Sequence, residues 1–136
     1  MDALVSIKPE FVRRILVGEK KYEYRKNIFK KDIQRIFVYS SSPEMRIVGY
    51  FDWAGTIFGN VNEVWEYTCD YAGIDANHYQ KYFRNKEYAY ALKIKKFIIF
   101  DEPINPWDYE GFKPPQSYCY TQNLKEELYE KLCSMV

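Results

Sequence analysis

Hydrophobic residues near the start of the chain recur at helical spacing. A short apolar opening at 4–7 leads to Pro9, which suits the first turn of a helix because its missing N–H is not needed there. Four apolar residues then fall on one helical face: Phe11, Val12, Ile15 and Leu16. Gly18 follows at the place of a left-handed C-cap, so the pattern predicts a helix over 9–17.

Three segments that follow have the character of β-strands. Residues 20–26 alternate, with Tyr22 and Tyr24 on one face and charged side chains on the other. Residues 35–40 are rich in β-branched and aromatic side chains, and 46–53 form a nearly continuous apolar run. The intervening Ser-Ser-Pro at 41–43 predicts a loop.

The middle of the chain predicts two helices and the longest strand. A capping-box pattern at Asn60 begins a helix that Gly73 ends, and Asp75 caps a second, shorter helix. Residues 87–100 alternate as a strand, and the apolar phase shifts at 95–96, which indicates a bulge.

The last part of the chain predicts one strand and one helix. Residues 101–115 hold four of the six prolines and predict a long, mostly irregular connection. A strand over 114–120 and a leucine-spaced helix over 123–132 follow. Because helices interrupt the strands rather than alternate with each one, the order predicts an α+β fold with a small, mostly antiparallel curled sheet or β-barrel.

Composition narrows the function classes. At 136 residues the chain has the length of a single domain, 1–136, and its 47% apolar content excludes a disordered protein. The formal net charge of +1 excludes a protein that coats nucleic acid by bulk charge, although a local basic cleft stays possible. The outlier is the 19% aromatic content, whose rings suit a core, base stacking or protein contacts.

Cysteine and histidine usage predicts no metal site and no cofactor. The three cysteines are odd in number and none forms a CxxC pair, while His78 is the single histidine. We interpret the thiols as reduced and the compartment as cytoplasmic. The N-terminus lacks a basic segment followed by an apolar run, and no apolar stretch reaches the roughly 20 residues that span a bilayer.

One motif carries most of the functional information. Four residues on the predicted helix, turn and strand fit the pattern GxKxxExR: Gly18, Lys20, Glu23 and Arg25. This pattern resembles the ASCH domain family of the PUA-like superfamily. The segments 36–43, 47–49 and 115–118 also fit the short prokaryotic and phage branch of that family, so the resemblance spans roughly residues 4 to 120.

The resemblance implies a PUA-like small β-barrel of mixed, mostly antiparallel strands flanked by helices. The motif then lines a cleft between barrel and helices, where family members are proposed to bind RNA or nucleotides. Some members are enzymes, among them an amidohydrolase that removes an acyl group from a modified cytidine and a ribonuclease. The expected function is therefore RNA or nucleotide binding. The alternatives are a hydrolase acting on a modified nucleoside or RNA, and a protein-interaction or regulatory module.

The chemistry of the motif agrees with a binding cleft. Arg25 is a fork-shaped donor suited to a phosphate or a base edge. Lys20 can bind phosphate, or act as a base or nucleophile if burial lowers its pKa, and Glu23 can hold Lys20 or relay a proton. Lys8 lies next to the start of the predicted helix 9–17, whose N-terminal N–H groups can add to an anion site. The competing interpretation is a solvated strand face whose charge pairs contribute little.

Further candidates lie outside the motif. Ser40 and Ser41 can donate to a phosphate or serve a turn, and Gln116 and Ser117 can hydrogen-bond a base edge or satisfy the barrel. Glu23 departs from the amidohydrolase branch, in which a threonine stands at this position. No histidine pair is present for the usual acid–base chemistry of a ribonuclease. The sequence therefore leaves open whether the cleft only binds or also catalyses.

Overall fold

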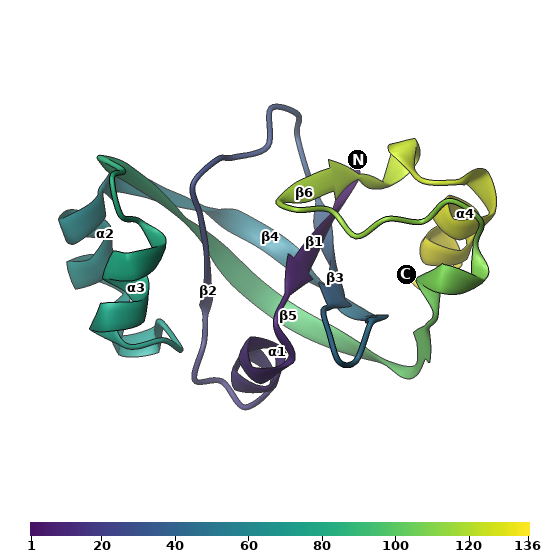
Figure 1. Ribbon diagram of the computed structural model, residues 1–136, viewed down its shortest axis with the longest axis horizontal. Coiled ribbons are helices and arrows are strands. Elements are labelled where there is room, and N and C mark those ends of the chain that lie inside the picture. The colour runs from purple at the N-terminus through teal and green to yellow at the C-terminus, as the bar shows by residue number, and fades with distance from the viewer.

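The protein is built around one curled six-stranded sheet. The computed structural model describes residues 1–136. The strands lie in the order β2-β5-β4-β3-β1-β6, and β1 and β3 are the parallel pair among otherwise antiparallel neighbours (Figure 1). Their bounds are β1 Asp2–Ile7, β2 Tyr22–Arg25, β3 Arg35–Ser40, β4 Arg46–Asn60, β5 Tyr88–Ile104 and β6 Tyr118–Tyr120.

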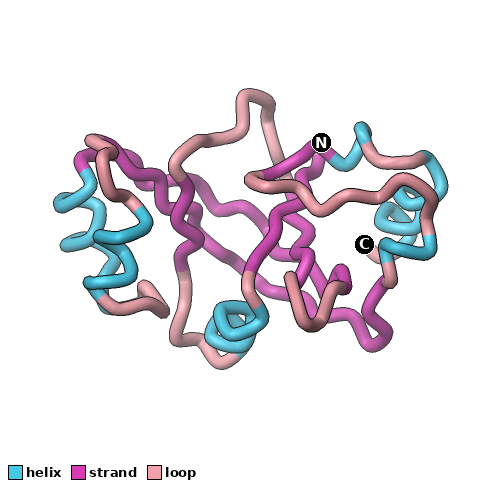
Figure 2. The backbone as a smooth tube through the Cα atoms, in the orientation of Figure 1, coloured by secondary structure: helices cyan, strands magenta, loops and turns pink.

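Four α-helices flank this sheet at separate places. They are α1 Pro9–Leu16, α2 Val61–Thr68, α3 Ala76–Tyr82 and α4 Glu126–Ser134. In Figures 1 and 2, α2 and α3 lie together at one end of the long β4–β5 ribbon, α4 lies at the other end, and α1 lies between them. No helix combines the length and apolar character needed to cross a membrane.

The alternation of side chains along β1 and β3 divides the apolar residues between two faces of the sheet. Val5 and Val38 point into the main core, which also holds Val12 and Ile15 of α1. Their neighbours, such as Phe37, point the other way and pack with the leucines of α4. A third cluster joins α2 and α3 to β2, β4 and β5. The α+β fold with a curled, mixed sheet flanked by helices is confirmed.

Most predicted elements are confirmed, although β4 continues seven residues past its predicted end at 53, because it pairs with β5 as far as Asn60. Strand β3 has the predicted bounds, and α1 is one residue shorter than predicted. The predicted bulge is present, because Lys96 has a φ of +52° and the β4–β5 register shifts there. Helix α2 ends at Thr68 in a 3-10 turn, so the prediction that it continues to Gly73 is wrong.

The predictions between residues 101 and 120 are wrong in part. Strand β5 continues to Ile104 across Pro103, because Ile104 still pairs with Ile47 of β4. A 3-10 turn over Pro106–Asp108 follows. Strand β6 contains only the last three residues of the predicted strand 114–120, since its pairing with β1 begins at Tyr118. The terminal helix begins at Glu126 rather than at residue 123.

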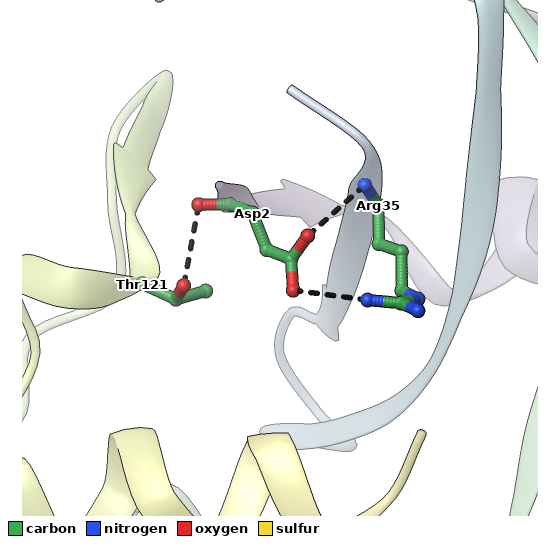
Figure 3. A network of polar contacts seen from close by, with 3 residues as sticks. All are labelled: Asp2, Arg35 and Thr121. Carbon is green, nitrogen blue, oxygen red and sulfur yellow. Dashed lines mark hydrogen bonds and ion pairs between the residues drawn. The ribbon is translucent and has the colours of Figure 1, made fainter. Parts of the chain in front are cut away.

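The N-terminal strand is fixed at its first residue by a small polar network. The Arg35 backbone N–H donates to one carboxylate oxygen of Asp2 at 3.2 Å, and the Arg35 guanidinium lies 3.7 Å from the other (Figure 3). The Thr121 hydroxyl donates to the Asp2 carbonyl at 3.2 Å. These contacts join β1 to β3 and to the turn after β6, and so set the register of the parallel pair.

We predict that Gly49→Ala destabilises the sheet. A Cβ at Gly49 would collide with the Ile98 carbonyl and lie 2.9 Å from the Phe97 ring, in the bulged part of β5. Since backbone must move to relieve this, the free energy of unfolding should fall by about 3 kcal/mol in urea denaturation. Gly59→Ala on the same strand is the control, because its Cβ makes ordinary contacts from 3.7 Å. Equal stability of the two variants would contradict the prediction.

Candidate functional site

Two local features hold Lys20 in place at the end of α1. Gly18 has a φ of +82°, and the turn it forms lets the backbone N–H of Lys20 donate to the Arg14 carbonyl at 3.1 Å. Lys20 also forms an isolated bridge with Ala72, which comes after α2. Gly73 leaves room beside it, since a Cβ there would lie 2.7 Å from Lys20 Cγ. Lys20 is therefore clamped between two distant parts of the chain.

The Lys20 side chain is buried in aromatic surroundings. It is 3% exposed, and its Nζ donates to the Ala72 carbonyl at 2.9 Å. The same Nζ lies 5.0 Å from the Tyr24 ring centre and 5.6 Å from that of Phe11. Burial lowers the pKa of Lys20, and Glu23 opposes this shift by favouring the charged form. A lysine in such a place is a better proton donor than a solvated one.

A small cavity lies beside this ammonium group. Its volume is about 80 Å³, and it is lined by Phe11, Lys20, Glu23, Tyr24, Ile74, His78 and Tyr82. Ligand pockets for drug-sized molecules start at roughly 300 Å³, so the cavity admits one chemical group rather than a whole nucleotide. The structure thus brings the lysine and the glutamate of the motif to one cavity with aromatic walls.

The cavity adjoins two wider hollows on the surface. The first, of about 540 Å³, shares His78 and Tyr82 with the cavity and also contains Lys8 and Lys81. The second, of about 510 Å³, shares Lys8 with the first and reaches Arg13 and Ser41. Two carboxylates, those of Glu10 and Asp75, interrupt this otherwise basic lining. A ligand larger than the cavity has a continuous surface to occupy.

Three buried side-chain polar atoms have no hydrogen-bond partner in the protein. They are Glu23 Oε2, Arg25 Nε and Ser40 Oγ, and the sequence singled out all three residues. Leaving a buried polar group unpaired costs about 1–3 kcal/mol, so native proteins have few of them. Of these three residues, Glu23 is the one that lines the cavity.

Arg25 links the two edges of the curled sheet. Its guanidinium donates to the Ser117 carbonyl at 3.0 Å, just before β6, and to the Ser6 carbonyl of β1 at 3.2 Å. Since β2 and β6 are the outermost strands, these bonds cross the open side of the half-barrel. Both terminal nitrogens of the guanidinium that was expected to bind phosphate therefore already donate to backbone carbonyl groups. Ligand binding by Arg25 stays a prediction.

The remaining candidates fall at separate places. Lys8 and Ser41 line the outer hollow at the start of α1, while Ser40 is fully buried beside Ile7. Gln116 is exposed, and Ser117 meets Arg25 through its backbone carbonyl. Neither of these last two lines the cavity, so they are not brought together with Lys20 and Glu23.

Comparison with known protein families finds a match that covers most of this chain. The sequence model of the ASCH domain matches residues 5–98, more than half of the chain. This chain belongs to the ASCH domain family. The family assignment drawn from the GxKxxExR pattern is thereby confirmed.

This ASCH domain is similar to proteins of Zymomonas mobilis both in sequence and in structure. An ASCH domain-containing ribonuclease from that organism is 29% identical over 143 residues, covering 98% of this chain and 91% of the relative. The crystal structure of an ASCH protein from Zymomonas mobilis superimposes with a TM-score of 0.85 at 28% identity, covering 98% of this chain and 94% of the other. The likeness therefore extends over the whole fold.

A third relative is a larger protein that matches this chain over part of its length. The large ribosomal subunit protein uL22 of Ureaplasma parvum is 28% identical over 102 residues, which are 75% of this chain but 33% of that protein. This chain is thus similar to one segment of that protein.

Sequence reasoning missed part of the cavity wall in this ASCH domain. The sequence placed Phe11 on the apolar face of a helix and gave His78 no role in a site, although the two rings meet edge-on at 5.4 Å and both line the cavity. His78 and Tyr82 are four residues apart on α3 and so share one face, which is the signal that the sequence offered. Which face meets α1 depends on tertiary packing.

The lowered pKa of Lys20 predicts a pH dependence of stability. The folded ASCH domain binds the Lys20 proton less tightly than the unfolded chain, whose lysine keeps its usual pKa of 10.5. The unfolding free energy therefore rises with pH, from the lowered folded pKa up to about 10.5. We expect the stability of wild type minus that of Lys20→Met to increase as the pH is raised toward 10.5. A difference that does not change with pH in urea denaturation would contradict the lowered pKa.

Proposed function

We propose that this ASCH domain binds RNA and cleaves it at the cavity lined by Lys20 and Glu23. The observation that carries the proposal is the buried lysine of lowered pKa beside a carboxylate oxygen that has no partner. Perturbed ionisable groups in a cavity are typical of functional sites. The ribonuclease from Zymomonas mobilis, which is similar over 98% of this chain, supports RNA as the substrate.

The two side chains suit a cleavage that uses the ribose 2′-hydroxyl. The Glu23 carboxylate accepts the 2′-hydroxyl proton as the 2′-oxygen attacks the neighbouring phosphorus. The Lys20 ammonium stabilises the charge on the phosphorane and gives a proton to the 5′-oxygen as the P–O5′ bond breaks. The products are a 2′,3′-cyclic phosphate and a free 5′-hydroxyl. This pair of groups does the work for which no histidine pair is available.

The hollows beside the cavity suit the rest of the strand. Lys8 and Lys81 line the first hollow, and Arg13 lines the second, so phosphates on either side of the reacting one meet basic side chains. Because these contacts are electrostatic, the affinity for RNA should fall as salt is raised.

The test is binding of a fluorescein-labelled, single-stranded RNA followed by fluorescence anisotropy at several salt concentrations. We expect Lys20→Met to weaken binding about tenfold, since methionine fills the space but donates nothing. Lys21→Met is the matched control, because Lys21 is exposed and packs over the Tyr71 ring outside the cavity. An affinity for RNA that does not change with salt concentration, or that is the same in the two variants, would contradict the proposal.

The aromatic walls of the cavity favour a second candidate, hydrolysis of a modified nucleoside. The rings of Phe11, Tyr24 and Tyr82 can enclose part of a base, and Glu23 can direct a water to an acyl group. Incubation with acylated nucleosides and detection of the released acid would separate this candidate from RNA cleavage.

A further inference from the structure

Three aromatic side chains at one end of the β4–β5 ribbon remain open to solvent although they contact one another. Phe58 is 56% exposed and Tyr88 is 51% exposed, and Tyr90 lies half-buried beside Phe58. We call Phe58, Tyr88 and Tyr90 the aromatic platform. None of the three belongs to the cores or lines the cavity of Lys20 and Glu23.

The rings of the aromatic platform contact one another face to face or with a moderate tilt. Phe58 and Tyr88 are 5.4 Å apart at an angle of 27°, and Phe58 and Tyr90 are 4.8 Å apart at 35°. Rings stacked in this way cover the faces that they share, and a base can extend the stack on an outer face that is open to solvent.

The strand register places the aromatic platform in line with the motif. Arg25 of β2 lies opposite Tyr90 of β5, which lies opposite Phe58 of β4. Ala89 and Ala91, on either side of Tyr90, pack with α2 and α3, so Tyr90 points to the opposite face of the sheet. Glu23 is two residues from Arg25 along β2, a distance of about 7 Å. The aromatic platform thus begins at the strand position of Arg25, two residues along β2 from the cavity residue Glu23.

The segment along this edge is basic. Between residues 26 and 31, directly after β2, three lysine side chains occur without a carboxylate. The two ion pairs of the structure, Arg35 with Asp2 and Lys125 with Glu110, involve none of these three. Lys26 is exposed and follows directly after the Arg25 row. A run of lysines outside any ion pair, which begins directly after the strand position opposite Tyr90, matches a phosphate backbone with unstacked bases.

We propose that the aromatic platform stacks bases of single-stranded RNA whose backbone follows β2 and the basic segment after it. The inference rests on the proposed function, because it supplies the neighbouring nucleotides of an RNA held at the cavity. Stacking on Phe58 and Tyr88 tolerates any base, since every base has a π-face. The aromatic platform then contributes affinity and length dependence, while Lys20 and Glu23 act on the reacting nucleotide.

Cross-strand aromatic contacts also stabilise a sheet, and an apolar cluster can bind a protein. Stabilisation of the sheet requires only contacts between rings on neighbouring strands, and it does not explain why the outer faces of these rings are open to solvent. Protein binding does not require the basic segment after β2. The open rings, together with the run of lysines that follows β2, are what favours RNA over these alternatives.

The test compares leucine variants of the aromatic platform in RNA binding. Phe58→Leu keeps an apolar side chain but loses the ring, and we expect roughly tenfold weaker binding of an RNA of about ten nucleotides. Phe58→Tyr should bind like wild type because the π-face remains. Tyr67→Leu is the matched control, since Tyr67 is 76% exposed on α2 away from the aromatic platform. Thermal unfolding shows that each variant is folded.

A second arm identifies stacking as the cause. Abasic sites in the RNA should weaken binding to wild type but have little further effect on Phe58→Leu, as expected for two changes that remove one contact. Additive losses, or equal affinity of Phe58→Leu and Tyr67→Leu, would overturn the inference and leave the cavity proposal intact. An aromatic platform that mediates self-association in light scattering, without affecting RNA, would also overturn it. Failure of wild type to bind any RNA instead removes the proposed function itself.

Discussion

Arg25→Met should lower the free energy of unfolding by about 3 to 5 kcal/mol. The guanidinium makes two charge-assisted hydrogen bonds, to the Ser6 and Ser117 carbonyls, and each such bond contributes about 1.5 to 3 kcal/mol. Methionine fills similar space but leaves both carbonyls without this donor. Because the two bonds join β2 to β1 and to the segment before β6, their loss opens the side of the half-barrel. Urea denaturation measures the effect.

Arg35→Met is the matched control for this prediction. Arg35 also lies on a strand, but its side chain is 37% exposed and its pair with Asp2 is 3.7 Å long, so less than about 1 kcal/mol should be lost. Arg25→Lys covers the case in which Arg25→Met does not fold, because an ammonium can keep one of the two bonds and should give an intermediate stability. Wild-type stability in both Arg25 variants would show that these two hydrogen bonds do not hold β2 to β1 and to the segment before β6.

Lys20→Met and Glu23→Gln should each slow RNA cleavage by a factor of about 100 or more. Removing a general acid or base costs about 10² to 10⁴ in rate. Glu23→Gln keeps the shape of the side chain and removes its ability to accept the 2′-hydroxyl proton. Cleavage of a labelled RNA on denaturing gels gives the rates, and mass spectrometry of the products should find the 2′,3′-cyclic phosphate.

Two controls make the cleavage result specific. An RNA with a single 2′-deoxy position should resist cleavage only at that linkage, because the attacking oxygen is missing. Glu19→Gln changes an exposed carboxylate four residues before Glu23 and should leave the rate unchanged. Full activity of Glu23→Gln, or cleavage at the deoxy linkage, would exclude the mechanism with Glu23 as the base.

The sequence predicted the elements whose pattern is local. The spacing of apolar residues placed α1 and β3 within one residue, and the phase shift at 95–96 located the bulge. Predictions were wrong where pairing partners decide the outcome. Strand β5 continues past Pro103 because β4 still lies beside it, and β6 is short because it pairs with only three residues of β1.

In the candidate site, too, the features set by local sequence were predicted and those set by long-range packing were not. Lys20 and Glu23 are close in sequence, and the turn at Gly18 followed by a strand is enough to place them together. The cavity wall comes from α3, whose approach to α1 depends on packing that no single segment specifies. Arg25 was expected to face a ligand, yet its guanidinium reaches two carbonyls from distant strands. Such long-range hydrogen bonds leave no signature in the pattern of residue types.

The most direct test of the central claim, that RNA acts at the cavity of Lys20 and Glu23, is NMR titration of the ¹⁵N-labelled protein with a short, non-cleavable 2′-O-methyl RNA. The account predicts that the largest amide shift changes fall on residues around the cavity, in particular Lys20, Glu23 and His78. It also predicts that Lys20→Met reduces these changes while the amides of α4 stay unaffected. Shift changes concentrated around Leu128 and Leu132 of α4, or none at all, would contradict it.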